Sequence, residues 1–136
     1  MPSKIRRSAL ALILVATAVT GCNDRISRQG YTISRLSRLY NALSIYASDH
    51  RGQLPHVKTG ADLKAALYPA YINDAGCFVD ESGRPFHVLF MPATLVDAQK
   101  KSPILLFASS TNSAGRVPAL LGNGQVRMEQ LPLTTN

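Results

Sequence analysis

Apolar residues recur at steps of three and four between residues 33 and 50, which is the spacing of one face of an α-helix. The positions on this face are Ile33, Leu36, Leu39, Tyr40, Leu43 and Ala47. Polar residues, among them Arg38 and Ser48, fall between them. The pattern therefore predicts one long amphipathic helix over 33–50, with its apolar face packed against the rest of the domain.

Local signals mark both ends of this helix. Thr32 or Ser34 can cap its start, because a hydroxyl oxygen accepts a hydrogen bond from an unpaired amide of the first turn. Gly52 and Pro55 follow its end, and neither residue type favours continuation of a helix.

The next part of the chain has the signals of shorter elements. A short helix is predicted over 62–67, where Thr59 or Asp62 can act as the cap. Apolar runs at 85–91 and 103–109 are typical of strands, and the second run is apolar enough to be central in a sheet.

The segment 117–131 has the strongest local signal of the domain. Two strand-like runs flank Asn123-Gly124, a dipeptide that tolerates positive φ at both central positions of a type I′ turn. This segment is expected to form a β-hairpin. The elements together predict an α+β domain in which one long N-terminal amphipathic helix packs on a small antiparallel sheet.

The first 21 residues have a different pattern. Lys4, Arg6 and Arg7 precede an uninterrupted run of small and apolar residues over 9–19. A basic start followed by roughly 7–15 apolar residues is typical of a secretory signal, whereas a spanning helix needs about 20.

The sequence Val19-Thr20-Gly21-Cys22 resembles the lipobox of bacterial lipoproteins. Small residues let the signal peptidase reach the bond between Gly21 and Cys22, and the thiol of Cys22 carries a diacylglyceryl group before the cut. The alternative is an ordinary secretory signal that happens to end near a cysteine. The agreement of basic start, apolar run and box favours the lipoprotein interpretation.

This resemblance implies three parts: a signal peptide at 1–21, a lipidated tether at 22–32 and a globular domain at 33–136. The 115 residues from Cys22 onward suffice for one core. They contain twelve Lys and Arg against eight Asp and Glu, a mild excess that does not indicate nucleic-acid binding. Asn23 follows the cysteine where Asp would favour inner-membrane retention, so we expect the outer membrane, with the domain facing the periplasm.

With Cys22 lipidated, Cys77 has no partner for an intramolecular disulfide. An odd cysteine in an exported protein is either a buried inert thiol or half of an intermolecular pair. Phe78 and Val79 follow Cys77, which favours a buried thiol.

The segment 35–55 resembles a stretch that follows the first helix in bacterial pilin-like and pseudopilin-like proteins. The matching residues are Leu39, Ala42, Leu43, Tyr46, Ala47, Asp49, Gly52 and Pro55. The segment 67–86 resembles the loop that follows in those proteins, and 119–131 resembles their C-terminal hairpin. The resemblance implies a pilin-like domain made of a helix and a sheet, with a structural or protein-binding role in secretion or pilus systems.

The start of the domain departs from that family. Gly30 and Tyr31 echo the junction after a pilin leader, but Arg35 stands where the family has Glu, and no apolar run of spanning length follows. The chain therefore looks like the globular half of a pseudopilin carried on a lipid anchor.

Residues that bind metals are present but lack a metal-binding spacing. The candidates are His50, His56, His87 and Cys77, which match no zinc pattern. A calcium site would need Asp80, Glu81 and Asn123 to converge, and nothing in the sequence brings them together. We expect no metal and no cofactor.

Catalytic motifs are also missing from the sequence. There is no G-x-S-x-G motif for a serine nucleophile. Asp49 and His50 are neighbours on the predicted helix, which directs their side chains about 100° apart. The run 122–125 is a turn and not a phosphate loop, since no Lys-Ser/Thr pair follows.

A basic set lies just after the expected anchor, at Arg25, Arg28, Arg35 and Arg38. These side chains either contact anionic lipid head groups or form a solvated face of the helix.

Two functional hypotheses follow. The favoured one is a non-enzymatic envelope lipoprotein whose pseudopilin-like domain is a structural or protein-interaction module. Its partners would be the membrane, through the lipid at Cys22, and another envelope protein. The alternative is a lipoprotein that binds a small ligand or a metal, or a weak hydrolase, with His87 in a cleft beside the sheet.

Overall fold

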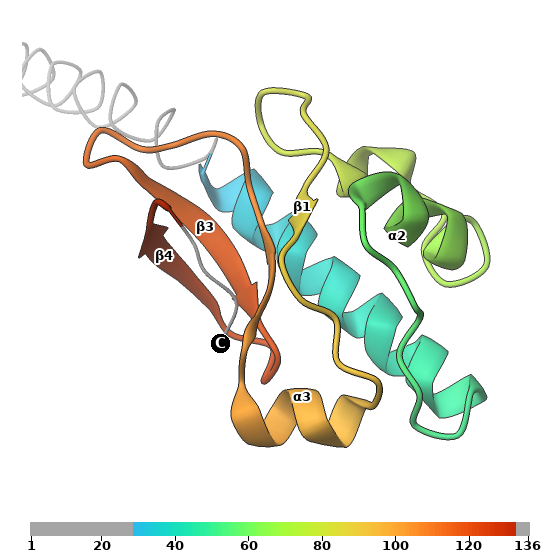
Figure 1. The fold of residues 1–136 in the computed structure, drawn as a ribbon. Helices are drawn as coiled ribbons and strands as arrows, with labels where there is room; N and C mark the ends of the chain where they lie inside the picture. The colour runs from blue at the N-terminus through green and yellow to red at the C-terminus, as the bar shows by residue number, and fades with distance from the viewer. Residues whose placement is uncertain (1–28, 133–136) are drawn as a thin grey trace, which may run out of the picture. The chain divides into compact units, whose positions relative to one another are not determined.

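The computed structural model describes residues 29–132, and from Tyr31 onward these belong to one compact unit. Residues 29–49 are helical. The later helices are α2 (Gly60–Leu67), the 3-10 helix η1 (Ala75–Phe78) and α3 (Leu95–Lys101), and the strands are β1 (His87–Val88), β2 (Ile104–Phe107), β3 (Arg116–Leu121) and β4 (Val126–Gln130). The strands form one antiparallel sheet in the order β1-β2-β3-β4, with the N-terminal helix behind it (Figure 1). The predicted α+β class with a small antiparallel sheet is confirmed.

The apolar face of the N-terminal helix forms one side of the core. Leu36, Leu39 and Leu43 are fully buried and belong to the same core cluster as Leu106 of β2 and Leu120 of β3. Leu106 and Leu120 are partners in the sheet register, so the helix packs on the face that carries both residues.

At the start of the N-terminal helix, the buried positions differ from the prediction. Ile33 is 38% exposed, and Thr32 is buried in its place, because the buried positions follow the series 32, 36, 39 and 43. Thr32 is also not a cap, since the helix already includes residues 29–31. The hydroxyl of Thr32 instead accepts a hydrogen bond from the amide of Glu81 at 3.2 Å.

The end of the helix lies where Gly52 predicts it. The helix ends at Asp49, and the amide of Gly52 donates to the carbonyl of Ala47 at 2.7 Å. Arg51 and Gly52 both have positive φ, at 57° and 83°. This arrangement closes the helix in the manner of a Schellman motif and turns the chain toward the buried Pro55.

Two elements between the helix and the hairpin were mispredicted. The run 85–91 forms strand only at His87–Val88, although the amide of Leu89 still donates to the carbonyl of Leu105 at 2.8 Å. Helix α3 is not predicted by the sequence pattern, although Thr94 caps it by accepting from the amide of Asp97 at 3.2 Å. By contrast, α2 matches the predicted short helix, with Thr59 as its cap.

The hairpin β3–β4 is confirmed, but its turn is not type I′. Gly124 has a φ of 89°, whereas Asn123 does not have positive φ. The amide of Gly124 donates to the carbonyl of Leu121 at 3.0 Å, and the amide of Leu121 donates to the carbonyl of Gln125 at 2.8 Å. The connection is therefore a three-residue loop with a glycine bulge.

Two glycines of this turn also allow close packing. A Cβ atom on Gly124 would lie 2.8 Å from Cε1 of Tyr40, so the glycine lets the hairpin rest on the helix. A Cβ atom on Gly122 would collide with the carbonyl oxygen of Ala98 in α3. The requirement for Gly122 was not recognised from the sequence, because it arises from a contact with a distant segment.

Replacement of Leu43 by Ala tests the packing of the helix on the sheet. Leu43 is 0% exposed, so its truncation is expected to cost about 2–5 kcal/mol of unfolding free energy. Ile45→Ala is the matched control, because Ile45 is 53% exposed on the same helix and should cost about 0.5 kcal/mol or less. Both values follow from chemical denaturation, and equal losses in the two variants would contradict the proposed packing.

Candidate functional site

A buried carboxylate lies at the junction of the segments that shape the candidate site. Asp80 is 1% exposed and precedes β1. Its Oδ1 accepts from the hydroxyl of Ser82 and from the amides of Ser82 and Arg84, at 2.9 and 3.2 Å for the amides. Its Oδ2 accepts from the amides of Ser109 and Ser110, at 2.9 and 3.1 Å, and from the Ser110 hydroxyl. One side chain thus joins the 79–85 loop to the residues that follow β2.

The N-terminal helix is attached to the same loop. Nη1 of Arg35 donates to the backbone carbonyls of Val79 and Asp80, at 3.0 and 3.1 Å. The bond from the Glu81 amide to the Thr32 hydroxyl adds a second link. Three segments distant in sequence are therefore held at one point.

These hydrogen bonds keep Asp80 charged. Burial alone would raise the pKa of this carboxyl, but the hydrogen bonds from Ser82, Arg84 and Ser109 outweigh burial and leave the pKa below its ordinary value of 3.8. Because N–H and O–H donors already surround both oxygens, Asp80 has little remaining capacity to bind a cation. Asn123 is also occupied, since its Oδ1 accepts from the amide of Gln125 at 3.0 Å.

A shallow cleft lies beside this junction. It has a volume of ≈ 680 Å³ and is formed by the start of α2, the segment leading into β1, the end of β2 and one residue after β4. The lining residues are Lys58–Ala61, Arg84–Val88, Phe107–Ser109 and Leu131. We call this cleft the His87 groove.

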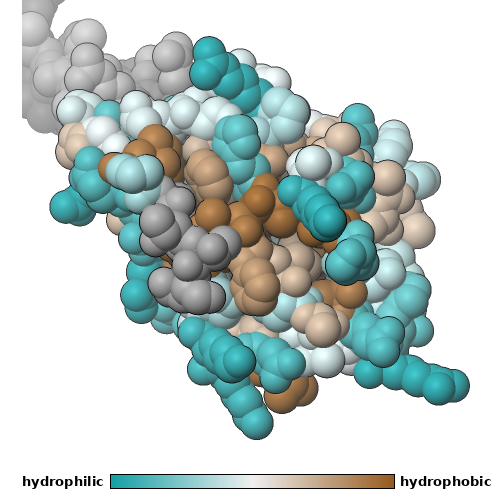
Figure 2. Space-filling view, in the orientation of Figure 1, coloured by the Kyte–Doolittle hydropathy of each residue, from teal (hydrophilic) through white to brown (hydrophobic). Residues whose placement is uncertain are grey.

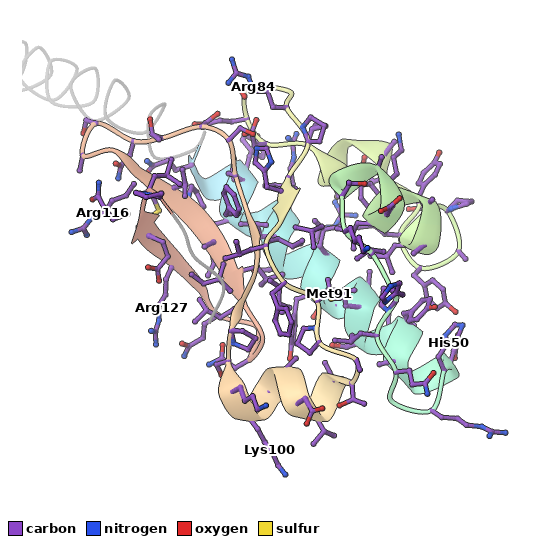
Figure 3. All side chains as sticks on the ribbon, viewed as in Figure 1. His50, Arg84, Met91, Lys100, Arg116 and Arg127 are labelled. Atoms are coloured by element: carbon purple, nitrogen blue, oxygen red, sulfur yellow. The ribbon has the colours of Figure 1, made fainter. Side chains whose placement is uncertain are left out.

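The central side chains of the His87 groove are His87 and Ser109. Nε2 of His87 lies 2.8 Å from Oγ of Ser109, and Oγ of Ser109 donates to the carbonyl of Pro85 at 3.4 Å. The imidazole stacks on Phe107, with ring centroids 4.9 Å apart. Arg84, which also lines the groove, lies far from Lys100 of α3 (Figure 3).

The polar groups around this His-Ser pair have hydrogen-bond partners within the domain. The Ser109 hydroxyl is within hydrogen-bond distance of both Nε2 of His87, at 2.8 Å, and the Pro85 carbonyl, at 3.4 Å. The amides of Ser109 and Ser110 donate to Asp80 and are therefore not free to bind another group.

The other candidates for metal ligation lie apart. His50 stacks on Tyr46, with centroids 3.8 Å apart, and its Nδ1 lies 2.7 Å from the Tyr46 carbonyl. His56 is exposed. Cys77 is buried, as predicted, and burial raises the pKa of its thiol. Within residues 29–132, no three His, Cys, Asp or Glu side chains form a group suited to a metal ion.

The four arginines of the proposed membrane-facing set have different surroundings. Arg35 is committed to the carbonyls of the 79–85 loop, and Arg38 forms a half-exposed ion pair with Asp74 at 3.2 Å. Arg25 and Arg28 lie outside the described residues, as do Gly21 and Cys22. In the described part of the chain, no helix has the length and apolar character needed to cross a bilayer.

Strand β4 provides a second candidate surface, because it is an edge strand of the described sheet. The amide of Ala108 donates to the carbonyl of Pro118 at 3.0 Å, so the backbone of Pro118 faces β2. Met128 of β4 lies opposite Pro118. Since antiparallel pairs alternate, the N–H and C=O of Met128 point away from β3, toward the open edge.

Comparison with known proteins identifies no relative: no family model, curated protein or solved structure matches this chain.

The importance of the buried junction can be tested with Asp80→Asn. The introduced amide side chain has only one oxygen. Its NH₂ group would therefore face the hydrogen-bond donors of Ser82 and Arg84 or those of Ser109 and Ser110. The expected loss is at least about 2 kcal/mol of unfolding free energy. Asp74→Asn is the control, because the half-exposed Asp74 caps η1, and Asn is an equally good cap.

The same variants test the protonation state of Asp80. The pKa of Asp80 is lowered in the folded protein. The stability that its charged form contributes is therefore present above the unfolded pKa of about 3.9 and is lost as the pH falls through the folded pKa. The stability difference between the wild type and Asp80→Asn should therefore be constant near neutral pH and shrink in acid. Denaturation curves recorded from about pH 7 to pH 2 measure this stability difference. A stability difference that does not change with pH would exclude a charged Asp80.

Proposed function

We propose that this protein is a non-enzymatic lipoprotein of the bacterial envelope whose pseudopilin-like domain is a structural or protein-interaction module. The lipobox-like sequence at 19–22 supports the anchor, and the pattern of residues 35–55 supports the relation to pseudopilins. The helix packed on an antiparallel sheet is consistent with that relation. The proposed location is the outer membrane, facing the periplasm, with an association with a secretion or pilus system.

The observation that carries the interaction role is the open edge of β4. An unpaired edge strand presents amides and carbonyls that an extended segment of another protein can pair with. Arg127, which is exposed, and Glu129 alternate with Met128 along this strand. In this proposal, pairing with the backbone supplies affinity, and the two charged side chains select the partner.

The anchor is tested by Cys22→Ala in a bacterial host. The variant should accumulate as an uncleaved precursor or as a form without lipid, because the thiol that carries the lipid is missing. Metabolic labelling with a fatty acid should label the wild type and not the variant. Cys77→Ala is the matched control and should be labelled like the wild type; labelling that does not depend on Cys22 would refute the anchor.

The edge is tested by Met128→Pro, because proline removes one backbone donor that points away from the sheet. Proline is tolerated on an edge strand when the missing N–H faces outward, so the domain should still fold. Cross-linking in intact cells, followed by capture, should recover at least about tenfold less of the envelope partner, since each tenfold corresponds to about 1.4 kcal/mol.

Met128→Ala is the matched control, because it shortens the same side chain and keeps the amide. It should retain the partner, whereas Arg127→Glu should change which partner is recovered. If a folded Met128→Pro variant retains every partner, β4 is only the solvated boundary of the sheet, and the interaction proposal loses its main support.

A further inference from the structure

We propose that the His87 groove binds an extended acidic peptide segment that inserts an apolar side chain. This inference rests on the proposed function in one respect: the peptide segment belongs to a protein partner. The lining of the groove and strand β4 share no residue, so each can be changed by its own substitution. The argument depends on the groove's floor, its charge and its openness to solvent.

The floor of the groove is apolar and in part exposed. Phe107 of β2 is half-buried and stacks against the His87 ring, and the lining residue Leu131 is 39% exposed. Figure 2 shows apolar surface in the middle of the face that the sheet turns away from the N-terminal helix, with hydrophilic residues around it. Such a floor accepts an aliphatic or aromatic side chain, because contact with it removes apolar area from water.

The rim of the groove carries two positively charged side chains. Lys58 and Arg84 are both exposed and come from separate segments, and no Asp or Glu is among the lining residues. Two carboxylates lie nearby, outside the lining, and their oxygens accept hydrogen bonds from backbone amides. Asp62 accepts from the amides of Lys58 and Thr59, at 3.2 and 3.3 Å, and Asp80 accepts from its own ring of donors. Charge complementarity therefore favours an acidic ligand.

The openness of the groove favours a peptide over a small molecule. Sites for small ligands bury most of the ligand's surface and use a few enclosed polar groups to orient it. Here the central imidazole is exposed, and the two cations lie on the rim. An extended segment can place one apolar side chain on the floor while its flanking carboxylates reach Lys58 and Arg84.

The test uses the full chain, purified in detergent, and a defined probe. The probe is a fluorescein-labelled synthetic peptide of eight residues, with two central phenylalanines between Asp and Glu residues. Fluorescence anisotropy gives its dissociation constant. The double variant Lys58→Glu/Arg84→Glu should weaken binding at least about tenfold. Phe107→Ala should weaken it as well, and replacement of the two phenylalanines of the peptide by serines should have a similar effect.

The matched control is Lys100→Glu/Lys101→Glu, which makes the same change of net charge on α3, far from Arg84 (Figure 3). Its dissociation constant should stay within about twofold of the wild-type value. Equal weakening by the two double variants would overturn the proposal, because binding would then reflect net charge alone. Equal binding of the serine peptide would also overturn the proposal. So would a wild-type protein that is folded, as its thermal melt shows, and does not bind the phenylalanine peptide.

The groove and edge proposals fail in different ways. Met128→Pro should leave peptide binding unchanged, because β4 contributes no residue to the lining of the groove. If Met128→Pro abolishes capture of the partner while the wild type does not bind the peptide, the groove proposal is wrong and the interaction role is kept. If the peptide binds as expected while capture is insensitive to Met128→Pro, the edge proposal is wrong.

Discussion

The fold depends on the hydrogen bonding of one buried carboxylate. Asp80 accepts from two groups of donors, one in the loop before β1 and one after β2. A buried charge is tolerated only while its hydrogen bonds are made, so neither segment can move away without a large cost. Arg35 and Thr32 extend this constraint to the N-terminal helix.

The constraint also positions the proposed groove. Arg84 and Ser109 each donate a backbone amide to Asp80, and both residues line the groove. These amides are directed at a structural carboxylate and not at the groove. The groove itself has an apolar floor with cations on its rim.

The two proposed contact surfaces use different properties of one sheet. The edge of β4 offers backbone groups, and the face that carries Phe107 and His87 offers apolar area. The opposite face packs against the N-terminal helix. A domain held near a membrane by a lipid at Cys22, as we propose, would keep both free surfaces available to envelope proteins.

The sequence by itself determined the elements that are specified by their own residues. The spacing of Leu36, Leu39 and Leu43 specifies the buried helix face, and Gly52 marks its end, since both signals act within a few turns of chain. Tertiary structure decided the rest. The bonds of Arg35 to Val79 and of Ser109 to Asp80 join residues 44 and 29 positions apart, and the close neighbours of Gly122 and Gly124 come from α3 and the N-terminal helix. No local pattern encodes such contacts, because they exist only once separate segments have packed together.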